Sequence, residues 1–227
     1  MPAIFYATIK DISPMSFAML KAPIRYLVIS LPVVLVLLLI SYFFIDKSLS
    51  VWVFQFGLHK APGFSSDVDL IITQLVYCAL LPTFAIYFYY QMQGHNSRLV
   101  RCLGLVCGSV SVAFFVKTSL QFLFGRYAPR YYQGKTLIFL QDPSRYGFHF
   151  LHGGGFPSGH MCVFTAALCA VCLYFPIYRW ISGILLLLLA GCLIGANYHF
   201  LSDVIAGTYL GLSITLALYY LQLKRSV

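Results

Sequence analysis

Long apolar stretches, separated by short polar breaks, run through almost the whole chain. A helix needs roughly 20 mostly apolar residues to cross about 30 Å of hydrocarbon. The stretches that meet or approach this length are 26–45, 70–92, 102 to about 124, 161–177, 180–198 and 204–223. The pattern predicts an all-α fold: a six-transmembrane-helix bundle that forms one domain over residues 1–227, with an extramembrane loop between helices 3 and 4.

Composition strengthens the membrane interpretation. Hydrophobic residues make up 60% of the 227 residues and charged residues 9%, whereas a soluble domain carries charge on about a quarter. Fifteen Lys and Arg against six acidic residues give a net charge of +9. In a membrane protein this excess is explained by topology and anionic headgroups, so we expect no nucleic-acid partner. The seven cysteines lie in apolar runs and indicate no disulfide framework.

Charge placement around the predicted spans gives the expected orientation. A modest majority of the cations lies on one side of the spans, and five of the six aspartates lie on the other. By the positive-inside tendency both termini are cytoplasmic. The longest loop, 125–160, then faces the periplasm of a bacterial inner membrane, although a lumenal loop would look the same. Residues 1–25 are interpreted as an amphipathic lead-in that stays attached.

The loop 125–160 is too aromatic for disorder and ends in Phe-Pro-Ser-Gly-His over residues 156–160. Ser158 can cap a helix, and Gly159 lets backbone N–H groups approach an anion at the positive end of the helix dipole. His160 would stand on the first helical turn, where it could give a proton to a departing oxygen. A capped helix with an inert interfacial histidine would show the same short pattern.

A second polar pair lies between the last two spans. His199 and Asp203 are four residues apart, so on a helical turn both side chains project to one face. The carboxylate can then fix the imidazole tautomer and leave the other ring nitrogen as a nucleophile or base. An isolated pair of this kind is usually structural. Here the predicted hairpin of spans four and five returns His199 to the membrane face that carries His160.

Two histidines and an anion-binding helix start at one bilayer surface suit phosphoryl transfer. One histidine can attack phosphorus while the other protonates the leaving oxygen, and no metal or other cofactor is required. The equatorial phosphate oxygens do need cations or N–H donors around them. The candidate cations are Arg126, Arg130, Lys117 and Arg145, although Lys117 could also snorkel to the interface.

These motifs resemble the membrane branch of the type 2 phosphatidic acid phosphatase (PAP2) superfamily. The resemblance spans about residues 117–207 and rests on Pro-Ser-Gly-His at 157–160 and on His199 to Asp203 followed by Val-Ile-Ala-Gly. Either motif alone is weak, whereas both in this order, separated by one hairpin, are specific. Members of the family dephosphorylate lipid phosphates and pyrophosphates.

The resemblance implies a role for each matching residue. His199 would be the nucleophile that forms a phosphohistidine, and Asp203 its orienting partner. His160 would be the general acid. Ser158 and Gly159 would contact the phosphate.

The chain also departs from the family pattern. Positions where the family carries phosphate-binding cations hold Gln121, Ala128 and Leu193. Arg126 lies in a Phe-Gly-Arg stretch that looks like a variant of the first motif, so we expect it to be the main substitute ligand. Lys117 lies one helical turn before Gln121 and could share its face. Arg130, past the proline, is a weaker candidate.

The predicted function is hydrolysis of a phosphomonoester or pyrophosphate on a membrane lipid through a phosphohistidine. Undecaprenyl pyrophosphate, phosphatidylglycerophosphate, phosphatidic acid and a lipid A phosphate all fit, and protein partners are left open. Two alternatives stay open: a lipid phosphotransferase, and a noncatalytic phospholipid-binding or lipid-transport protein. His149 and His152 with His160 support a metal site only weakly, and we expect these two histidines to line the loop over the active site or to be interfacial.

Overall fold

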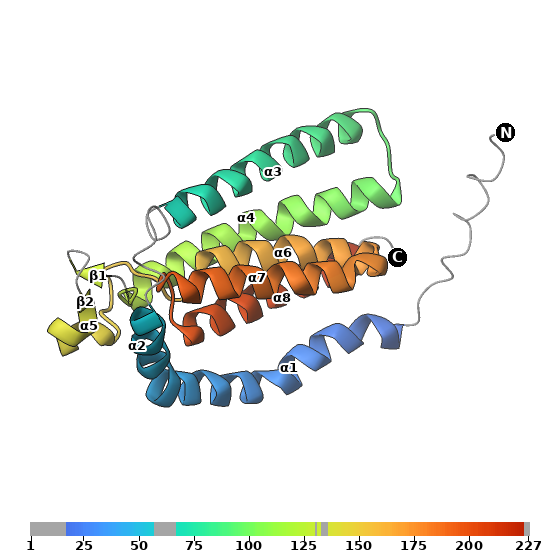
Figure 1. Ribbon diagram of the computed structural model, residues 1–227. Helices are drawn as coiled ribbons and strands as arrows, with labels where there is room; N and C mark the ends of the chain where they lie inside the picture. The colour runs from blue at the N-terminus through green and yellow to red at the C-terminus, as the bar shows by residue number, and fades with distance from the viewer. Residues whose placement is uncertain (1–16, 57–66, 130, 133–135, 225–227) are drawn as a thin grey trace.

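The computed structural model describes residues 17–56, 67–129, 131–132 and 136–224. Its long helices lie side by side, and both ends of the described chain lie at one end of the bundle (Figure 1). The long helices are α1 (Phe17–Ile40), α3 (Asp67–Met92), α4 (Arg98–Phe124), α6 (Gly159–Tyr174), α7 (Arg179–Gly195) and α8 (Leu201–Lys224). The shorter elements are the π-helical turn η1 (Ser41–Ile45), α2 (Asp46–Phe56), the antiparallel pair β1 (Tyr131–Tyr132) and β2 (Thr136–Leu137), α5 (Ile138–Gln141), and the 3-10 turns η3 (Pro143–Tyr146) and η4 (Pro176–Tyr178).

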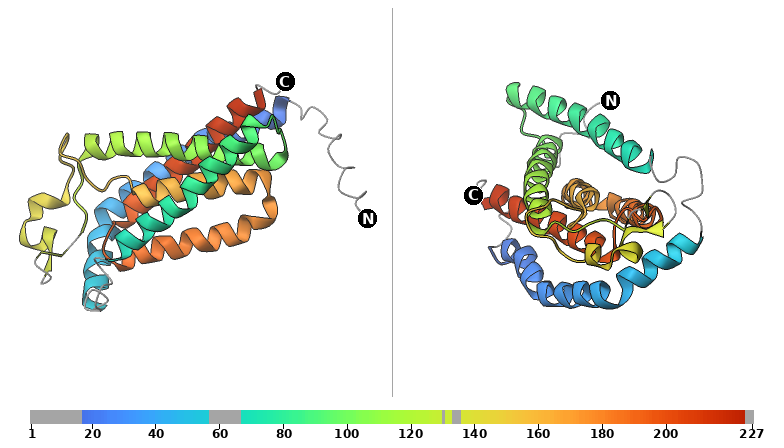
Figure 2. Two further views of the ribbon diagram at one scale, coloured as in Figure 1. Left: turned by 90° about the horizontal axis from the view of Figure 1, so that it is seen from above. Right: turned by 90° about the vertical axis from the view of Figure 1, so that its left-hand side faces the viewer.

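Helix α6 forms the centre of the bundle, where it packs against α4 and α8. Small side chains dominate the contact: Ala113, Cys162 and Ala166 are fully buried there. Helices α1 and α3 lie on opposite sides of this central group (Figure 2). The short side chains of α6 thus bring its neighbours close, as is typical of helices packed within a membrane.

Two glycines of α8 allow an unusually close approach to α6. A Cβ atom on Gly207 would lie 2.4 Å from the carbonyl oxygen of Ser158, and one on Gly211 would lie 2.3 Å from that of Cys162. Any side chain at these positions would force the two backbones apart. The glycines therefore hold the first turns of α6 and α8 together, and both turns carry predicted site residues.

The all-α prediction is confirmed. The only strands among the described residues are those of the short antiparallel pair, with two residues each. Four stretches of the described residues are long and apolar enough to cross a membrane: Arg25–Phe56, Arg98–Phe124, Pro176–Gly195 and Leu201–Lys224. The chain is therefore a membrane protein. The six-span topology stays a prediction, because α6 has 16 residues and is shorter than a full crossing.

The helix that contains the first predicted span is longer than predicted. Residues 17–25, assigned to the lead-in, are already helical in α1, and the helix continues through η1 and α2 to Phe56. The charged pair Asp46 and Lys47 looks like the end of a span in the sequence. The helix does not end there because Asp46 is buried and has partners, described below.

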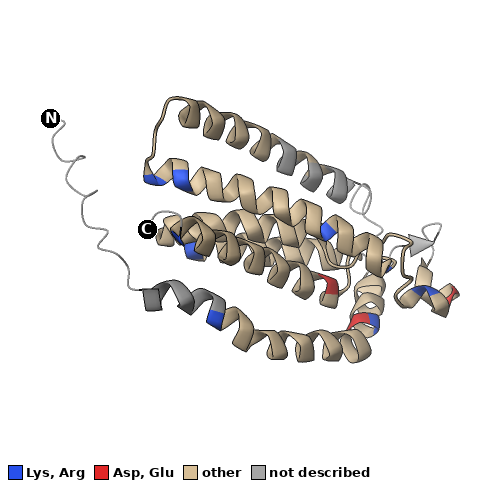
Figure 3. Ribbon diagram, turned by 180° about the vertical axis from the view of Figure 1, so that it is seen from behind, with Lys and Arg blue, Asp and Glu red and all other residues tan. Residues whose placement is uncertain are grey.

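Charged residues gather at the two ends of the helices. Lys and Arg lie at both ends, whereas the Asp residues that are drawn in red lie at the end opposite the termini (Figure 3). The orientation with cytoplasmic termini stays a prediction.

Candidate active site

The start of α6 is capped as its sequence predicts. Ser158 Oγ accepts a hydrogen bond from the backbone N–H of Met161 at 3.5 Å. The backbone N–H of Ser158 donates to the carbonyl oxygen of Asp203 at 3.0 Å, which ties this cap to the first turn of α8. Ser158 is fully buried. Gly159 follows as the first helical residue, so the N-terminus of α6 points its free N–H groups toward the end of the bundle that carries the site.

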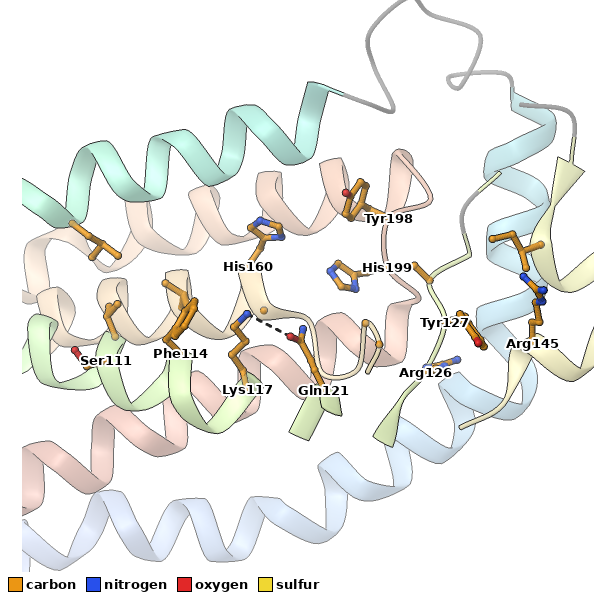
Figure 4. Close-up of a pocket in the computed structure, with 18 of the residues that line it drawn as sticks. Ser111, Phe114, Lys117, Gln121, Arg126, Tyr127, Arg145, His160, Tyr198 and His199 are labelled. Atoms are coloured by element: carbon orange, nitrogen blue, oxygen red, sulfur yellow. Dashed lines mark hydrogen bonds between the residues drawn. The ribbon is translucent and has the colours of Figure 1, made fainter. Parts of the chain in front are cut away.

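His160 and His199 approach each other at this helix start. Their ring centroids lie 6.4 Å apart with an interplanar angle of 68°. His160 comes from the first turn of α6, and His199 from the connection between α7 and α8 (Figure 4). The hairpin of α6 and α7 therefore brings the two residues together as predicted, and both line the same pocket.

Asp203 lies beside His199. Its Oδ2 atom is 3.6 Å from His199 Nδ1 and accepts a hydrogen bond from the backbone N–H of Phe200 at 3.0 Å. The first distance suits an ion pair but is too long for a hydrogen bond. His199 Nδ1 is buried and has no hydrogen-bond partner among the described residues. A small ring movement would close this gap, so the pair has the predicted i, i+4 arrangement in an open form.

Arg126 lies behind Asp203, with its guanidinium fully buried. One terminal nitrogen, Nη1, donates to Asp203 Oδ1 and to Ser202 Oγ, both at 2.6 Å, and Nη2 donates to Asp46 Oδ2 at 2.8 Å. Aromatic rings surround the guanidinium within cation–π distance: Tyr42, Tyr146, Phe148 and Phe200. Burial opposes its charge, but the carboxylates of Asp203 and Asp46 outweigh this effect and raise the pKa of Arg126.

Arg126 lines the pocket, and its role as a phosphate ligand stays a prediction. Both terminal nitrogens are directed at carboxylates, so a phosphate contact through them would require breaking an ion pair. The physical reason is Asp46, which the sequence analysis did not assign to the site. One signal could have identified it: a carboxylate at the edge of an apolar span needs a buried partner.

Lys117 reaches the start of α6. A Cβ atom on Gly159 would lie 3.3 Å from Lys117 Nζ, which places the ammonium group next to the first turn of that helix. Lys117 Nζ donates to Gln121 Oε1 at 3.4 Å, and Gln121 Nε2 donates to the carbonyl oxygen of Pro157 at 3.0 Å. Gln121, at the family's lysine position, therefore orients Lys117 and supports the Pro-Ser-Gly-His turn (Figure 4).

The other expected cations occupy different positions. Arg145 lines the pocket, but it is half-exposed and paired with Asp142 at 3.2 Å. Arg130 lies outside the described residues. Leu193, at the family's arginine position, is fully buried in an apolar cluster with Met161 and Val204. Among the described lysines and arginines that line the pocket, Lys117 alone has no carboxylate within ion-pair distance.

Glycines of the loop cover His199. A Cβ atom on Gly155 would lie 3.5 Å from His199 Nδ1, and one on Gly154 would lie 2.3 Å from the backbone nitrogen of Arg126. The N–H of Gly155 donates to the carbonyl oxygen of Arg126 at 2.6 Å. A side chain at Gly154 would collide with the backbone of Arg126, so the loop can lie this close only because this position has none, whereas a Cβ at Gly155 would make an ordinary contact.

The site opens into a pocket of about 1100 Å³. Polar side chains line one end: Lys117, Gln121, His160, Tyr198 and His199. Apolar side chains of α3, α4 and α6 line the other: Leu80, Leu81, Phe84, Val110, Phe114 and Val163. The pocket therefore suits an elongated molecule with a small polar group at one end and an apolar body at the other.

The loop histidines do not line this pocket. His149 is half-buried against Tyr127, with ring centroids 5.0 Å apart, and His152 is exposed. The described residues contain no group of three His, Cys, Asp or Glu that could hold a metal ion. The seven cysteines are free thiols.

Fold and site together define a helical membrane protein with a pocket that holds two histidines at its polar end. The model of the PAP2 superfamily matches residues 102–226, more than half of the chain, and the chain belongs to this superfamily. Members of the family are generally phosphatases that act on phosphorylated lipids in membranes. Comparison with curated proteins and with solved structures found no match. Asp46, with α1 and α2, lies outside the matched residues.

Proposed function

We propose that the protein is a membrane lipid phosphatase that hydrolyses a phosphomonoester or pyrophosphate through a phosphohistidine on His199. The observation that carries this proposal is the pair of imidazoles 6.4 Å apart at the polar end of a pocket whose other end is apolar. The carboxylate of Asp203 lies beside the His199 ring, and His160 lies on the first turn of α6, a helix start with free N–H groups. These are the parts that transfer of a phosphoryl group needs.

The first step forms the phosphoenzyme. Because Nδ1 of His199 faces Asp203, its Nε2 is the atom that attacks phosphorus. The bond between phosphorus and the lipid oxygen breaks, and His160 gives its proton to that oxygen. Positive charge develops on the His199 ring as the new bond forms, and the carboxylate of Asp203 stabilises it.

The second step releases phosphate. His160, now neutral, takes a proton from a water molecule, which attacks phosphorus and breaks the bond to His199 Nε2. The products are inorganic phosphate and the protein in its starting state. During both steps the N–H groups at the start of α6 and the ammonium of Lys117 bind the phosphate oxygens.

Replacing Lys117 by methionine is expected to lower kcat/KM by about 10²-fold, since removal of one such electrostatic contact has about this effect. The measurement is phosphate release by purified protein in detergent. Lys224→Met, at the far end of α8, is the matched control and should behave as the wild type. Unchanged activity in Lys117→Met would show that the phosphate takes its cation from elsewhere in the chain.

The function is tested by incubating the purified protein with short-chain phosphatidic acid in the presence of chelator. We expect phosphate release that is lost in the double variant His160→Ala/His199→Ala. Equal release by the wild type and this variant, with lipid binding retained, would support a noncatalytic lipid-binding protein. Transfer of the phosphoryl group to an added alcohol in place of water would support a phosphotransferase. Loss of activity with chelator would contradict the metal-free mechanism.

A further inference from the structure

Asp46 joins the site from a part of the chain that the family motifs do not include. Asp46 is the first residue of α2, directly after the π-helical turn η1, and its side chain is fully buried. Oδ1 accepts hydrogen bonds from Ser41 Oγ at 3.1 Å and from the backbone N–H of Ser202 at 3.0 Å. Oδ2 accepts from Arg126 Nη2 at 2.8 Å and from the hydroxyl of Ser202. Four hydrogen-bond donors therefore satisfy this buried carboxylate, so Asp46 is held in one fixed position.

The π-helical turn places this carboxylate. The backbone N–H of Asp46 donates to the carbonyl oxygen of Ser41, five residues earlier, which is the hydrogen bond of a π-helix. The same turn carries Tyr42, whose ring lies over the Arg126 guanidinium with 5.0 Å between centroid and Cζ, and whose carbonyl accepts the hydroxyl of Tyr146. Isolated π-helical turns are rare in proteins and occur frequently at functional sites.

Asp46, Arg126 and Asp203 form a buried row of charges that ends at His199. Two carboxylates share one guanidinium, so the row has a net charge of −1 next to the imidazole. If Arg126 were paired with Asp203 alone, the charge next to His199 would be zero. The second carboxylate therefore leaves negative charge available where positive charge develops during attack on phosphorus.

We propose that Asp46 is a positioning residue of the phosphatase site, which anchors Arg126 and the first turn of α8 and keeps a net negative charge behind the nucleophile. This inference rests on the proposed function. The other ionisable groups that share the pocket of His199 are Lys117 from α4, Tyr127, Arg145 from η3, His160 from α6 and Tyr198. None of them is altered in the variants below.

The test is the pH profile of kcat/KM for phosphate release. Its acid limb reports protonation of the nucleophile in the free protein. Asp46→Asn keeps the shape of the side chain and brings the net charge of the row to zero. Protonation of His199 then becomes harder, and we expect the acid limb to move to lower pH by an amount on the order of one unit. We expect kcat to fall roughly 10- to 100-fold, because Arg126 and Asp203 lose their fixed position.

A second substitution distinguishes charge from folding. Asp46→Asn/Arg126→Gln restores the net charge of −1, so its acid limb should return toward the wild-type position while kcat stays low. A fraction of misfolded protein lowers kcat but cannot move the limb in one variant and return it in the other. Asp142→Asn is the matched control, since Asp142 is a half-exposed aspartate paired with Arg145 and lies outside the buried row, and its profile should be unchanged.

The outcomes separate this inference from the proposed function. An unshifted acid limb in an active Asp46→Asn protein would overturn the role of Asp46 and leave the phosphatase in place. If Asp46→Asn does not fold, the comparison of Arg126→Gln, whose row has a net charge of −2, with the double variant decides: an acid limb at higher pH in Arg126→Gln supports the inference, and equal limbs overturn it. Absence of phosphate release from the wild-type protein would overturn the proposed function itself.

Discussion

Replacing His199 by alanine is expected to lower phosphate release by about 10⁴-fold or more, because the variant has no nitrogen that can form the phosphoenzyme bond. The ring of His199 lines the pocket, so the space that the substitution leaves joins the pocket instead of forming a closed cavity, and lipid binding should persist. The measurement combines turnover with chemical quenching after mixing with radiolabelled substrate. The wild type should yield an acid-labile, alkali-stable phosphoprotein, and the variant none.

The two histidines can be distinguished by the leaving group. His160→Ala should also be slow with a lipid alcohol as leaving group, since that oxygen needs a proton as its bond breaks. A phenolic leaving group of low pKa needs no proton, so with such a substrate His160→Ala should regain phosphoenzyme formation and His199→Ala should not. His152→Ala, an exposed histidine of the same loop, is the control and should match the wild type. A labelled phosphoprotein in His199→Ala would place the nucleophile elsewhere.

The parts of the site that depend on local sequence could be predicted. Ser158 caps α6 because a serine before an apolar helix has an oxygen in reach of the free N–H groups. His199 and Asp203 lie together because residues four apart share a helical face. Only one hairpin separates the two motifs, so hydropathy alone returns both to the same end of the bundle. These predictions need only the local sequence and the number of helices between the two motifs.

The position of Arg126 could not be predicted in the same way, because it depends on distant partners. Arg126 is separated from Asp46 and from Asp203 by more than 70 positions in the sequence, and no local pattern couples them. The buried carboxylates, not the phosphate site, determine where its guanidinium lies. Leu193 shows the converse effect: the family's arginine position has become part of an apolar cluster, so no charge could be accommodated there without a cavity or a partner.

Replacing Arg126 by alanine is expected to destabilise the fold by about 3–5 kcal/mol, because it leaves two buried carboxylates without their shared cation. Turnover should fall with it, since Asp203 and His199 lose their support. The measurement is thermal unfolding in detergent together with phosphate release. Arg145→Ala is the matched control: its ion pair with Asp142 is half-exposed and screened by solvent, so the unfolding temperature should stay near that of the wild type.

The Arg126 variant also decides between the two roles considered for this residue. A phosphate ligand, once removed, would raise KM and lower kcat while leaving the unfolding temperature near that of the wild type. Removal of a residue that neutralises buried carboxylates would instead lower the unfolding temperature. Adding Asp46→Asn to the variant removes one of the two uncompensated charges, so a supporting role predicts that the double variant is more stable than Arg126→Ala alone. A ligand role predicts no such recovery, because the phosphate would still lack its cation.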